Sequence, residues 1–108
     1  MSVTKFKYLR SKAILKACRE LPCQLCGADD GTVVAAHSNQ AIHGKGRGIK
    51  ASDQYVAALC FKCHHEIDQG SHMTKTARQE AWDFAHQYTR MHLAMRGLWP
   101  YEQEPLCK

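Results

Sequence analysis

The sequence has no long apolar run, since nowhere does it approach the roughly 18 consecutive apolar residues of a membrane-spanning helix. The basic residues 1–10 are not followed by the apolar segment of a secretory signal. Low-complexity tracts are also missing. The length of 108 residues suits one domain and is too short for a multidomain enzyme. These absences predict a single cytoplasmic domain, favoured as a monomer, with no membrane partner.

Acidic side chains are scarce at the N-terminus. Residues 1–20 hold six basic side chains against Glu20 alone, whereas residues 21–108 hold nine of each sign. The whole formal charge of +5 therefore lies on the first 20 residues. Such a segment favours a polyanionic partner, and nucleic acid is the one we expect. The alternative is a solvated helix face. The side chains assigned to non-specific phosphate contacts are Lys5, Lys7, Lys12 and Lys16.

Cysteine, by contrast, is frequent, with six residues in this short chain. Cys23 and Cys26 form one Cys-x-x-Cys pair, and Cys60 and Cys63 form a second one 33 residues later. Two such pairs supply the four thiolates of a closed structural zinc site, which would stabilise a small core. A disulfide framework is typical of secreted chains, and a redox motif is expected singly in a βαβ context. We therefore predict structural Zn²⁺. The remaining cysteines are expected to be free: Cys18 and Cys107.

Hydrophobic periodicity and turn residues predict an α+β fold. The expected elements are a helix over 5–20 ended by Pro22, a strand over 32–36 that His37 closes, a strand over 55–59, a helix over 64–69 stopped by Gly70, and a longer helix from the N-cap Thr74 to about Arg96. The glycine-rich stretch 38–54 is expected to be an extended loop. The tail over 99–108 is expected to fray.

The long C-terminal helix carries an apolar stripe that we assign to the core. Its members are Ala77, Ala81, Phe84, Tyr88, Met91 and Met95, widened by Trp82, Ala85 and Leu98. Two histidines of this helix, His86 and His92, are interpreted as structural or surface residues.

Three side chains suggest hydrolytic chemistry. His37 closes the first predicted strand, His64 opens the short helix, and Asp68 follows four residues later. Residues at i and i+4 share a helix face, so His64 and Asp68 can bind one divalent ion. A histidine opposite that ion can activate water, and phosphodiester hydrolysis needs both a base and a metal.

The loop and its surroundings offer further candidate contacts to DNA. Glycines permit a close backbone approach to phosphates, and neighbouring cations hold them. The alternative is a solvated flexible loop, in which Asn39 makes a local hydrogen bond. His65 leaves its helix about 100° away from His64, so we assign it to DNA or to the surface rather than to the metal. The cations assigned to DNA here are Lys45, Arg47 and Lys50, with His43 beside them.

The order of these motifs resembles that of the zinc-stapled HNH nucleases, which have the ββα-metal fold. The shared pattern comprises the Cys-x-x-Cys pair, Ala36-His37 at a strand end, Gly46-Arg47-Gly48-Ile49-Lys50, Asp53 before the second strand, and Cys60 through Asp68. It is similar to that of a phage and prophage branch, the YbcO proteins and the RecA-dependent nuclease Ref. The resemblance covers residues 9–72.

This resemblance implies a small zinc-stabilised ββα-metal domain with flanking N- and C-terminal helices. The whole chain, 1–108, would then divide into a basic arm over 1–20, zinc knuckles and core over 21–72, a helix over 73–98 and a tail over 99–108.

The resemblance also assigns roles. It makes His37 the general base, and His64 and Asp68 the ligands of a catalytic Mg²⁺, Mn²⁺ or other divalent ion. Ala36 stands where many such sites carry a further ligand. Asp53, His72 or water would then complete the metal shell.

The leading hypothesis is thus a metal-dependent DNA endonuclease linked to recombination, with a recombination protein as a second partner. One alternative is a non-catalytic zinc module that binds nucleic acid. Another is a zinc-stapled protein-interaction domain, which leaves the charge bias unexplained.

Overall fold

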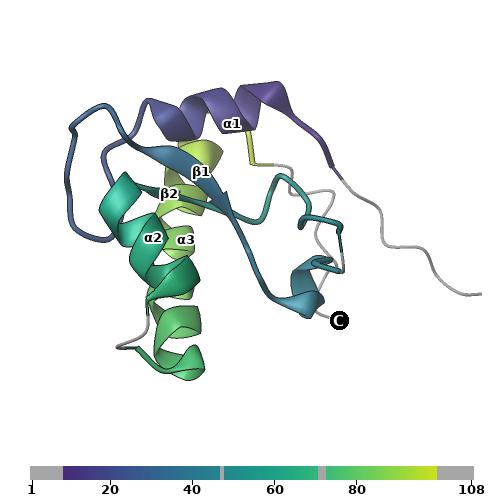
Figure 1. The fold of residues 1–108 in the computed structure, drawn as a ribbon. Helices are drawn as coiled ribbons and strands as arrows, with labels where there is room; N and C mark the ends of the chain where they lie inside the picture. The colour runs from purple at the N-terminus through teal and green to yellow at the C-terminus, as the bar shows by residue number, and fades with distance from the viewer. Residues whose placement is uncertain (1–8, 47, 71–72, 100–108) are drawn as a thin grey trace, which may run out of the picture.

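The computed structural model describes residues 9–46, 48–70 and 73–99, and these fold into a small α+β domain, as predicted. Figure 1 shows the arrangement of its elements around a two-stranded sheet. They are α1 (Lys12–Arg19), β1 (Val34–His37), the 3₁₀ helix η1 (Ala41–His43), β2 (Val56–Leu59), α2 (Phe61–Gln69) and α3 (Lys75–Met95). None of the described helices is both long and apolar enough to cross a membrane.

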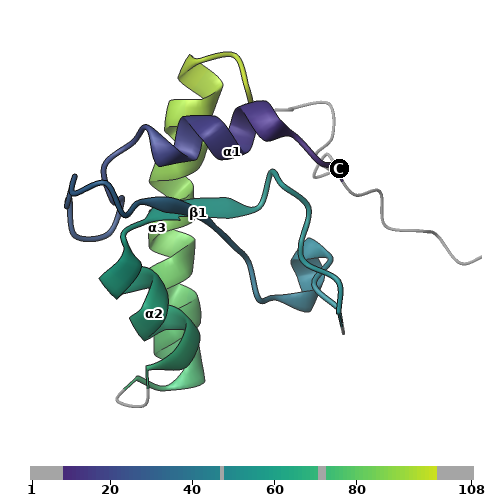
Figure 2. The ribbon, with the colours of Figure 1, turned by 45° about the horizontal axis from the view of Figure 1, so that its top comes forward.

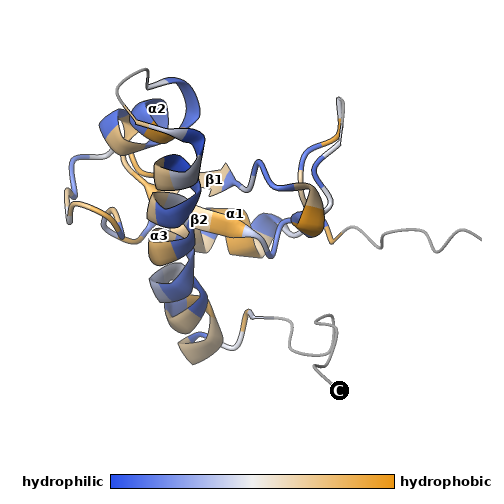
Figure 3. Cartoon of the chain, turned by 90° about the horizontal axis from the view of Figure 1, so that it is seen from below, coloured by the Kyte–Doolittle hydropathy of each residue, from blue (hydrophilic) through white to orange (hydrophobic). Residues whose placement is uncertain are grey.

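The sheet is antiparallel and forms the centre of the core. Val34 pairs with Leu59 at one end, and His37 pairs with Val56 at the other. All four residues of β2 are buried, because α3 packs on this strand while α1 packs on β1. Figure 3 shows β2 coloured as hydrophobic, in keeping with the burial of its four residues. Both ribbon views show α2 beside α3, with the 38–54 segment extending away from the helices (Figures 1 and 2).

Side chains of α3 satisfy backbone groups that a two-stranded sheet leaves without partners. The Thr89 hydroxyl accepts from the Ala58 N–H at 2.9 Å, and His86 Nδ1 lies 2.8 Å from the carbonyl oxygen of Val56. The indole N–H of Trp82 donates to the carbonyl of Ala36 at 3.0 Å. Buried backbone groups need such partners, so α3 holds the sheet by hydrogen bonds as well as by packing. His86 is structural, as predicted.

The buried face of α3 differs from the predicted one. Trp82, Ala85, Thr89 and Leu93 are buried. The main members of the predicted stripe lie towards solvent: Phe84 is 49% exposed, Tyr88 39%, Met91 52% and Met95 80%. The helix is apolar on two sides, and the side that buries is the one whose polar groups reach the sheet. The prediction was right for Trp82 and Ala85 and wrong for the exposed residues.

The first helix also begins later than predicted. Residues 9–11 are not helical, and Ser11 is the N-cap, its hydroxyl accepting from the Ile14 N–H at 3.2 Å. Leu9 instead exchanges backbone hydrogen bonds with the loop, since the Asp53 N–H donates to its carbonyl at 2.8 Å and its own N–H donates to the Ser52 hydroxyl at 2.6 Å. A long-range contact therefore overrides the helical pattern. The predicted helical residues 5–8 lie outside the described residues.

The other boundaries agree with prediction to within a few residues. Thr74 caps α3, its hydroxyl accepting from the Ala77 N–H at 3.0 Å, and Gly97 has the positive φ of 73° expected just after a helix end. The loop over 38–54 contains η1 and a short bridge between Gly46 and Ile49, so it is more ordered than an extended loop. Most of the predicted tail, over 100–108, lies outside the described residues.

Candidate functional site

Four cysteines from two separate segments form one cluster. Cys23 and Cys26 lie in the turn after α1, Cys60 is the N-cap of α2, and Cys63 lies in its first turn. The four sulfur atoms all lie within 4.8 Å of one another, and the Sγ atoms of Cys26 and Cys60 are 3.7 Å apart. These are free thiols. The arrangement could bind a metal ion such as zinc, in agreement with the predicted ligand set.

Backbone hydrogen bonds hold the first knuckle in place. The Cys23 N–H donates to the carbonyl of Ala28 at 2.8 Å, and the Gln24 N–H donates to the carbonyl of Ala58 at 2.8 Å. The second bond ties the segment of Cys23 and Cys26 to β2, two residues before Cys60 begins the second cysteine pair. The pairing of strand and knuckle thus brings the two cysteine pairs together.

The pKa values of the cluster thiols indicate that a cation would stabilise their ionised forms. Burial opposes ionisation of Cys23, but hydrogen bonds from the backbone of Cys26, Cys60 and Leu25 lower its pKa to about 7. Burial raises the pKa of the Cys63 thiol, and the neighbouring sulfurs, including the charge on Cys23, raise it further. One thiolate therefore opposes the next, because like charges at this separation repel. A divalent ion removes that repulsion, so this donor set fits zinc.

A second cluster centres on His37 at the end of β1. The Nε2 atom of His37 lies 2.7 Å from Oδ1 of Asp53. The Asp53 side chain is only 3% exposed and that of His37 is 17% exposed. Sequence reasoning proposed Asp53 as one way to complete a metal shell. The structure instead places it against His37.

Two further interactions fix the Asp53 carboxylate. The Ser11 N–H donates to Oδ2 at 2.7 Å, and the guanidinium of Arg10 lies 3.3 Å from Oδ1. Burial opposes ionisation of this carboxyl, but the hydrogen bonds from His37 and Ser11 and the charges of His37 and Arg10 hold its pKa below the ordinary value. Asp53 is therefore ionised at neutral pH.

The ionised carboxylate decides the tautomer of His37. A carboxylate can only accept hydrogen bonds, so Nε2 of His37 must carry a proton and donate it. In the neutral imidazole, Nδ1 then holds the free lone pair. Among the described residues, Nδ1 has no hydrogen-bond partner. In its neutral form, His37 therefore presents Nδ1 as a hydrogen-bond acceptor.

The predicted metal ligands of α2 line a common hollow. His64 and Asp68 border a surface cavity of about 190 Å³ together with Phe61, His65 and Gln69. The exposed His65 ring stacks on Phe61, with the centroids 6.1 Å apart. His64 and Asp68 therefore share one side of the helix, as the i, i+4 spacing predicts, and they are open to a ligand.

A hydrogen bond connects this helix with the end of β1. Asn39 follows His37 by two residues, and its Nδ2 donates to Oδ1 of Asp68 at 3.1 Å. The local hydrogen bond predicted for Asn39 is therefore replaced by a long-range one. It holds Asp68 beside the segment that follows His37.

The described residues contain no metal-binding group of three or more His, Cys, Asp or Glu side chains apart from the four cysteines. His37, His64 and Asp68 accordingly do not form a single cluster of ligand atoms. The arrangement consists of the His37–Asp53 pair on one side and, on the other, the two predicted metal ligands of α2, His64 and Asp68, which we call the α2 donor pair. His72, the other residue suggested for the metal shell, lies outside the described residues.

The predicted DNA-contacting cations have different environments. Lys12 and Lys50 are exposed, and His65 is exposed on α2. The Lys16 ammonium is paired with Glu20 at 2.6 Å, and Lys45 lies 3.4 Å from the carbonyl of Gly46. The remaining predicted contacts, Lys5, Lys7 and Arg47, lie outside the described residues.

The structure corrects the interpretation of His43. Its Nδ1 lies 2.7 Å from the Ser38 hydroxyl, and its ring stacks on Tyr55 with the centroids 4.4 Å apart. Burial lowers the pKa of His43, which favours the neutral form. His43 packs against the core and is not a mobile loop cation.

Sequence reasoning missed the structural part played by Arg10. Its guanidinium donates to the carbonyls of Ala51 at 2.7 Å and Lys50 at 3.0 Å, and it pairs with Asp53. In the sequence it is one of several basic residues near the N-terminus, and nothing local distinguishes it. Only the return of the 50–53 segment to residues 9–11 reveals this contact.

No family model, no curated protein and no solved structure matches this chain.

Proposed function

We propose that this chain is a metal-dependent endonuclease of the HNH type that hydrolyses DNA phosphodiester bonds. The observation that carries the proposal is the 2.7 Å contact between His37 Nε2 and the buried Asp53 carboxylate. A carboxylate that fixes the tautomer of a histidine is a recurring device for preparing a general base. The Asn39–Asp68 hydrogen bond supports it by holding the α2 donor pair beside the β1 end.

His37 would act through its Nδ1 atom. The lone pair of Nδ1 accepts a proton from the attacking water, and the resulting imidazolium is stabilised by the Asp53 carboxylate at Nε2. Arg10 and Ser11 keep Asp53 ionised and fixed, so the ring does not need to reorient during the step. Asp53 is a positioning residue in this scheme, because it acts through His37.

His64 and Asp68 would hold the catalytic divalent ion. An imidazole and a carboxylate fit Mg²⁺, Mn²⁺ or Zn²⁺, and both side chains open onto the same hollow. When bound, such an ion supplies charge stabilisation to the phosphoryl group and the leaving oxygen. Asn39 orients the Asp68 carboxylate by its hydrogen bond to Oδ1 and leaves Oδ2 for other contacts.

A non-catalytic DNA-binding zinc module is the second candidate. The observation that favours it is the lack of a third metal-ligating side chain on α2 and its neighbours among the described residues. It does not account for the His37–Asp53 pair, because a binding module has no use for a histidine held as a base. The recombination link and a recombination-protein partner belong to the endonuclease proposal.

The deciding experiment is DNA cleavage by wild type, His37→Ala and His92→Ala. His92 lies near the C-terminal end of α3 and serves as the matched control. Supercoiled and single-stranded DNA are incubated with zinc-loaded protein and added Mg²⁺ or Mn²⁺, with and without a recombinase filament. We expect His37→Ala to lose on the order of 10²–10⁴-fold in rate while binding DNA, and His92→Ala to cleave as wild type does. Equal trace cutting by all three proteins in every condition, with DNA binding retained, would contradict the nuclease proposal and favour the binding module instead.

A further inference from the structure

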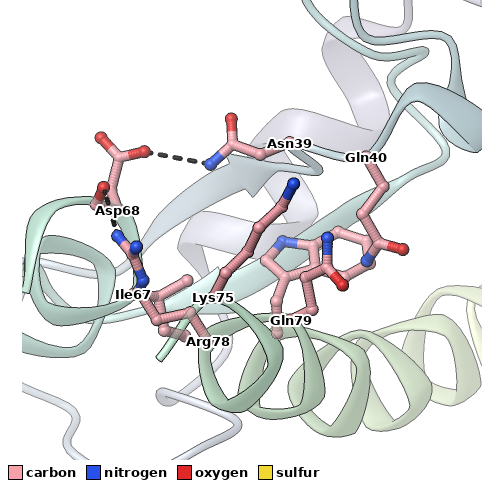
Figure 4. A pocket seen from close by; sticks show the side chains of 8 residues that line it. Asn39, Gln40, Ile67, Asp68, Lys75, Arg78 and Gln79 are labelled. Atoms are coloured by element: carbon pink, nitrogen blue, oxygen red, sulfur yellow. Dashed lines mark hydrogen bonds between the residues drawn. The ribbon is translucent and has the colours of Figure 1, made fainter. Parts of the chain in front are cut away.

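A pocket of about 220 Å³ lies between the beginning of α3, the end of α2 and the segment after β1 (Figure 4). We call it the α2–α3 pocket. Lys75 and Arg78 enter it from α3, Asp68 from α2 and Asn39 from the β1 side. Figure 4 shows the Lys75 side chain extending towards Asn39 and the Arg78 guanidinium pointing towards Asp68. The pocket thus brings two cations next to a predicted metal ligand.

The position of Lys75 is unfavourable for the helix itself. The first turn of α3 contains no acidic residue, and Lys75 is its first residue. A cation at a helix N-terminus opposes the macrodipole, which favours negative charge there. Among the described residues, the Lys75 ammonium has no hydrogen bond or ion pair. Lys75 is exposed, so its ammonium is free to contact an anion that enters the pocket.

Arg78 carries a buried hydrogen-bond donor that the described residues leave unsatisfied. One of its terminal nitrogens donates to the backbone carbonyl of Asp68 over a long 3.4 Å. Its Nε atom is buried and has no hydrogen-bond partner among the described residues. A buried donor without an acceptor is destabilising, and native structures rarely retain one without a reason. An anion in the pocket would supply acceptor oxygens to this guanidinium.

We infer that the α2–α3 pocket binds a phosphate group of the DNA backbone next to the phosphate that is cleaved. This inference rests on the proposed function. Asp68 lines both this pocket and the hollow it shares with His64, so a strand that reaches the α2 donor pair passes both. The apolar surface of Ile67 and Trp82 in the same pocket suits the sugar that joins two phosphates.

The charges in the pocket are compatible with a phosphate. Lys75 and Arg78 outnumber the Asp68 carboxylate, and Asn39 already donates a hydrogen bond to Asp68 Oδ1. The N-terminal peptide groups of α3 add partial positive charge at the same place. Asp68 repels a phosphate less when a cation neutralises it, so DNA affinity should rise when Mg²⁺ is added.

The test measures DNA binding separately from cleavage. In a His37→Ala background, Lys75→Gln and Arg78→Gln are compared with Lys62→Gln, which removes an exposed lysine of α2 outside the pocket. Fluorescence anisotropy of a labelled duplex is recorded over a salt series with Zn²⁺ retained. We expect Lys75→Gln to weaken binding about tenfold at low salt and to reduce the log–log salt slope by about 0.9, the value for one duplex phosphate contact. Lys62→Gln should change neither quantity.

A chemical probe locates the contact. Duplexes that carry one uncharged methylphosphonate, placed at a different position in each duplex, are bound to the His37→Ala protein and to the His37→Ala/Lys75→Gln double variant. At one position, adjacent to the bond that the protein with His37 cleaves, the methylphosphonate should lower the DNA affinity of the first protein and leave that of the second unchanged. The pocket does not bind phosphate if Lys75→Gln and Lys62→Gln have the same DNA affinity and the same log–log salt slope. The same conclusion follows if a methylphosphonate at every position lowers the DNA affinity of both proteins equally. If the position effect is found but the protein with His37 intact never cleaves DNA, the proposed function fails, and only the binding of a backbone phosphate in the pocket stands.

Discussion

Asn39 and Asp68 are 29 residues apart in the sequence, yet Nδ2 of Asn39 donates to Oδ1 of Asp68 at 3.1 Å. This bond joins the segment after β1 to the last turn of α2. It connects the base at His37 to the donor pair of His64 and Asp68, and it faces the α2–α3 pocket. One exposed amide therefore holds the α2 donor pair beside the end of β1.

Asn39→Ala should weaken the catalytic metal without unfolding the protein. Without its amide donor, Asp68 loses its orientation, and outer hydrogen-bond partners of metal ligands typically contribute about 10–100-fold to affinity or activity. We expect a higher Mn²⁺ concentration for half-maximal cleavage and a melting temperature close to that of wild type. Gln79→Ala, which alters an amide of the same pocket that is not bonded to Asp68, is the control. An unchanged Mn²⁺ dependence would contradict the prediction.

Asp53→Asn should abolish most cleavage by reversing the tautomer of His37. The amide can donate a hydrogen bond where the carboxylate only accepts, so Nε2 of His37 need no longer carry the proton. We expect a loss on the order of 10²–10⁴-fold in rate, with DNA binding preserved. The rate is measured on supercoiled DNA, and the His37 tautomer is read from ¹⁵N chemical shifts. Full activity in Asp53→Asn would show that His37 does not act as the base.

Cys63→Ser should leave the domain largely unfolded. Structural zinc supplies roughly 10 kcal/mol or more of folding free energy in small zinc modules, and the serine hydroxyl is a poor ligand. Elemental analysis should find one zinc ion per wild-type chain, and circular dichroism should show loss of helix in the variant. Cys18→Ser is the control, because Cys18 is buried but lies outside the cluster. This variant should keep its zinc and its helix content. A folded, zinc-free wild type would refute the assignment.

Acid should destabilise the fold through His86. Burial lowers the pKa of His86 to about 4, so the folded state holds it neutral while the unfolded state protonates near 6.5. The stabilisation is present above pH 6.5 and is lost as the pH falls towards 4, by about 3 kcal/mol in total. Burial lowers the pKa of His43 too, which acts in the same direction.

Urea unfolding at several pH values measures this dependence. His86→Asn should show a shallower fall in unfolding free energy below pH 6.5 than wild type, while His92→Asn should follow wild type. Because zinc release affects all three proteins alike, the difference between them isolates His86. Parallel curves for wild type and His86→Asn would contradict the prediction.

Thr89→Val should destabilise the protein by about 1–3 kcal/mol, the usual effect of leaving a buried donor without an acceptor. The Thr89 hydroxyl accepts from the Ala58 N–H at 2.9 Å, and valine has nearly the same shape without the oxygen. Thr76→Val, at an exposed position in the first turn of α3, should change the unfolding free energy little. Equal effects of the two substitutions on urea unfolding would show that the hydrogen bond to β2 is unimportant.

The sequence pattern predicts the existence of α3 but not which side of it is buried. The sequence indicates an amphipathic helix with a Thr74 cap, and both features are present. It does not indicate which of two apolar sides is buried. Trp82, His86 and Thr89 decide this, because their polar atoms bond to the backbone of the sheet. Phe84 and Met91 cannot donate a hydrogen bond to the sheet, and they stay exposed.

Local spacing by itself determined the two Cys-x-x-Cys pairs, the strand ends, the cap of α3 and the shared face of His64 and Asp68. Each depends on residues close together in the chain, where backbone geometry limits the outcome. The tertiary structure alone decided that Asp53 contacts His37, that Asn39 contacts Asp68 and that Arg10 reaches the loop at Ala51. These contacts join segments 16 to 41 residues apart, so only the packing of the strands and helices brings their atoms together, and the buried Asp53 carboxylate in particular must then find partners.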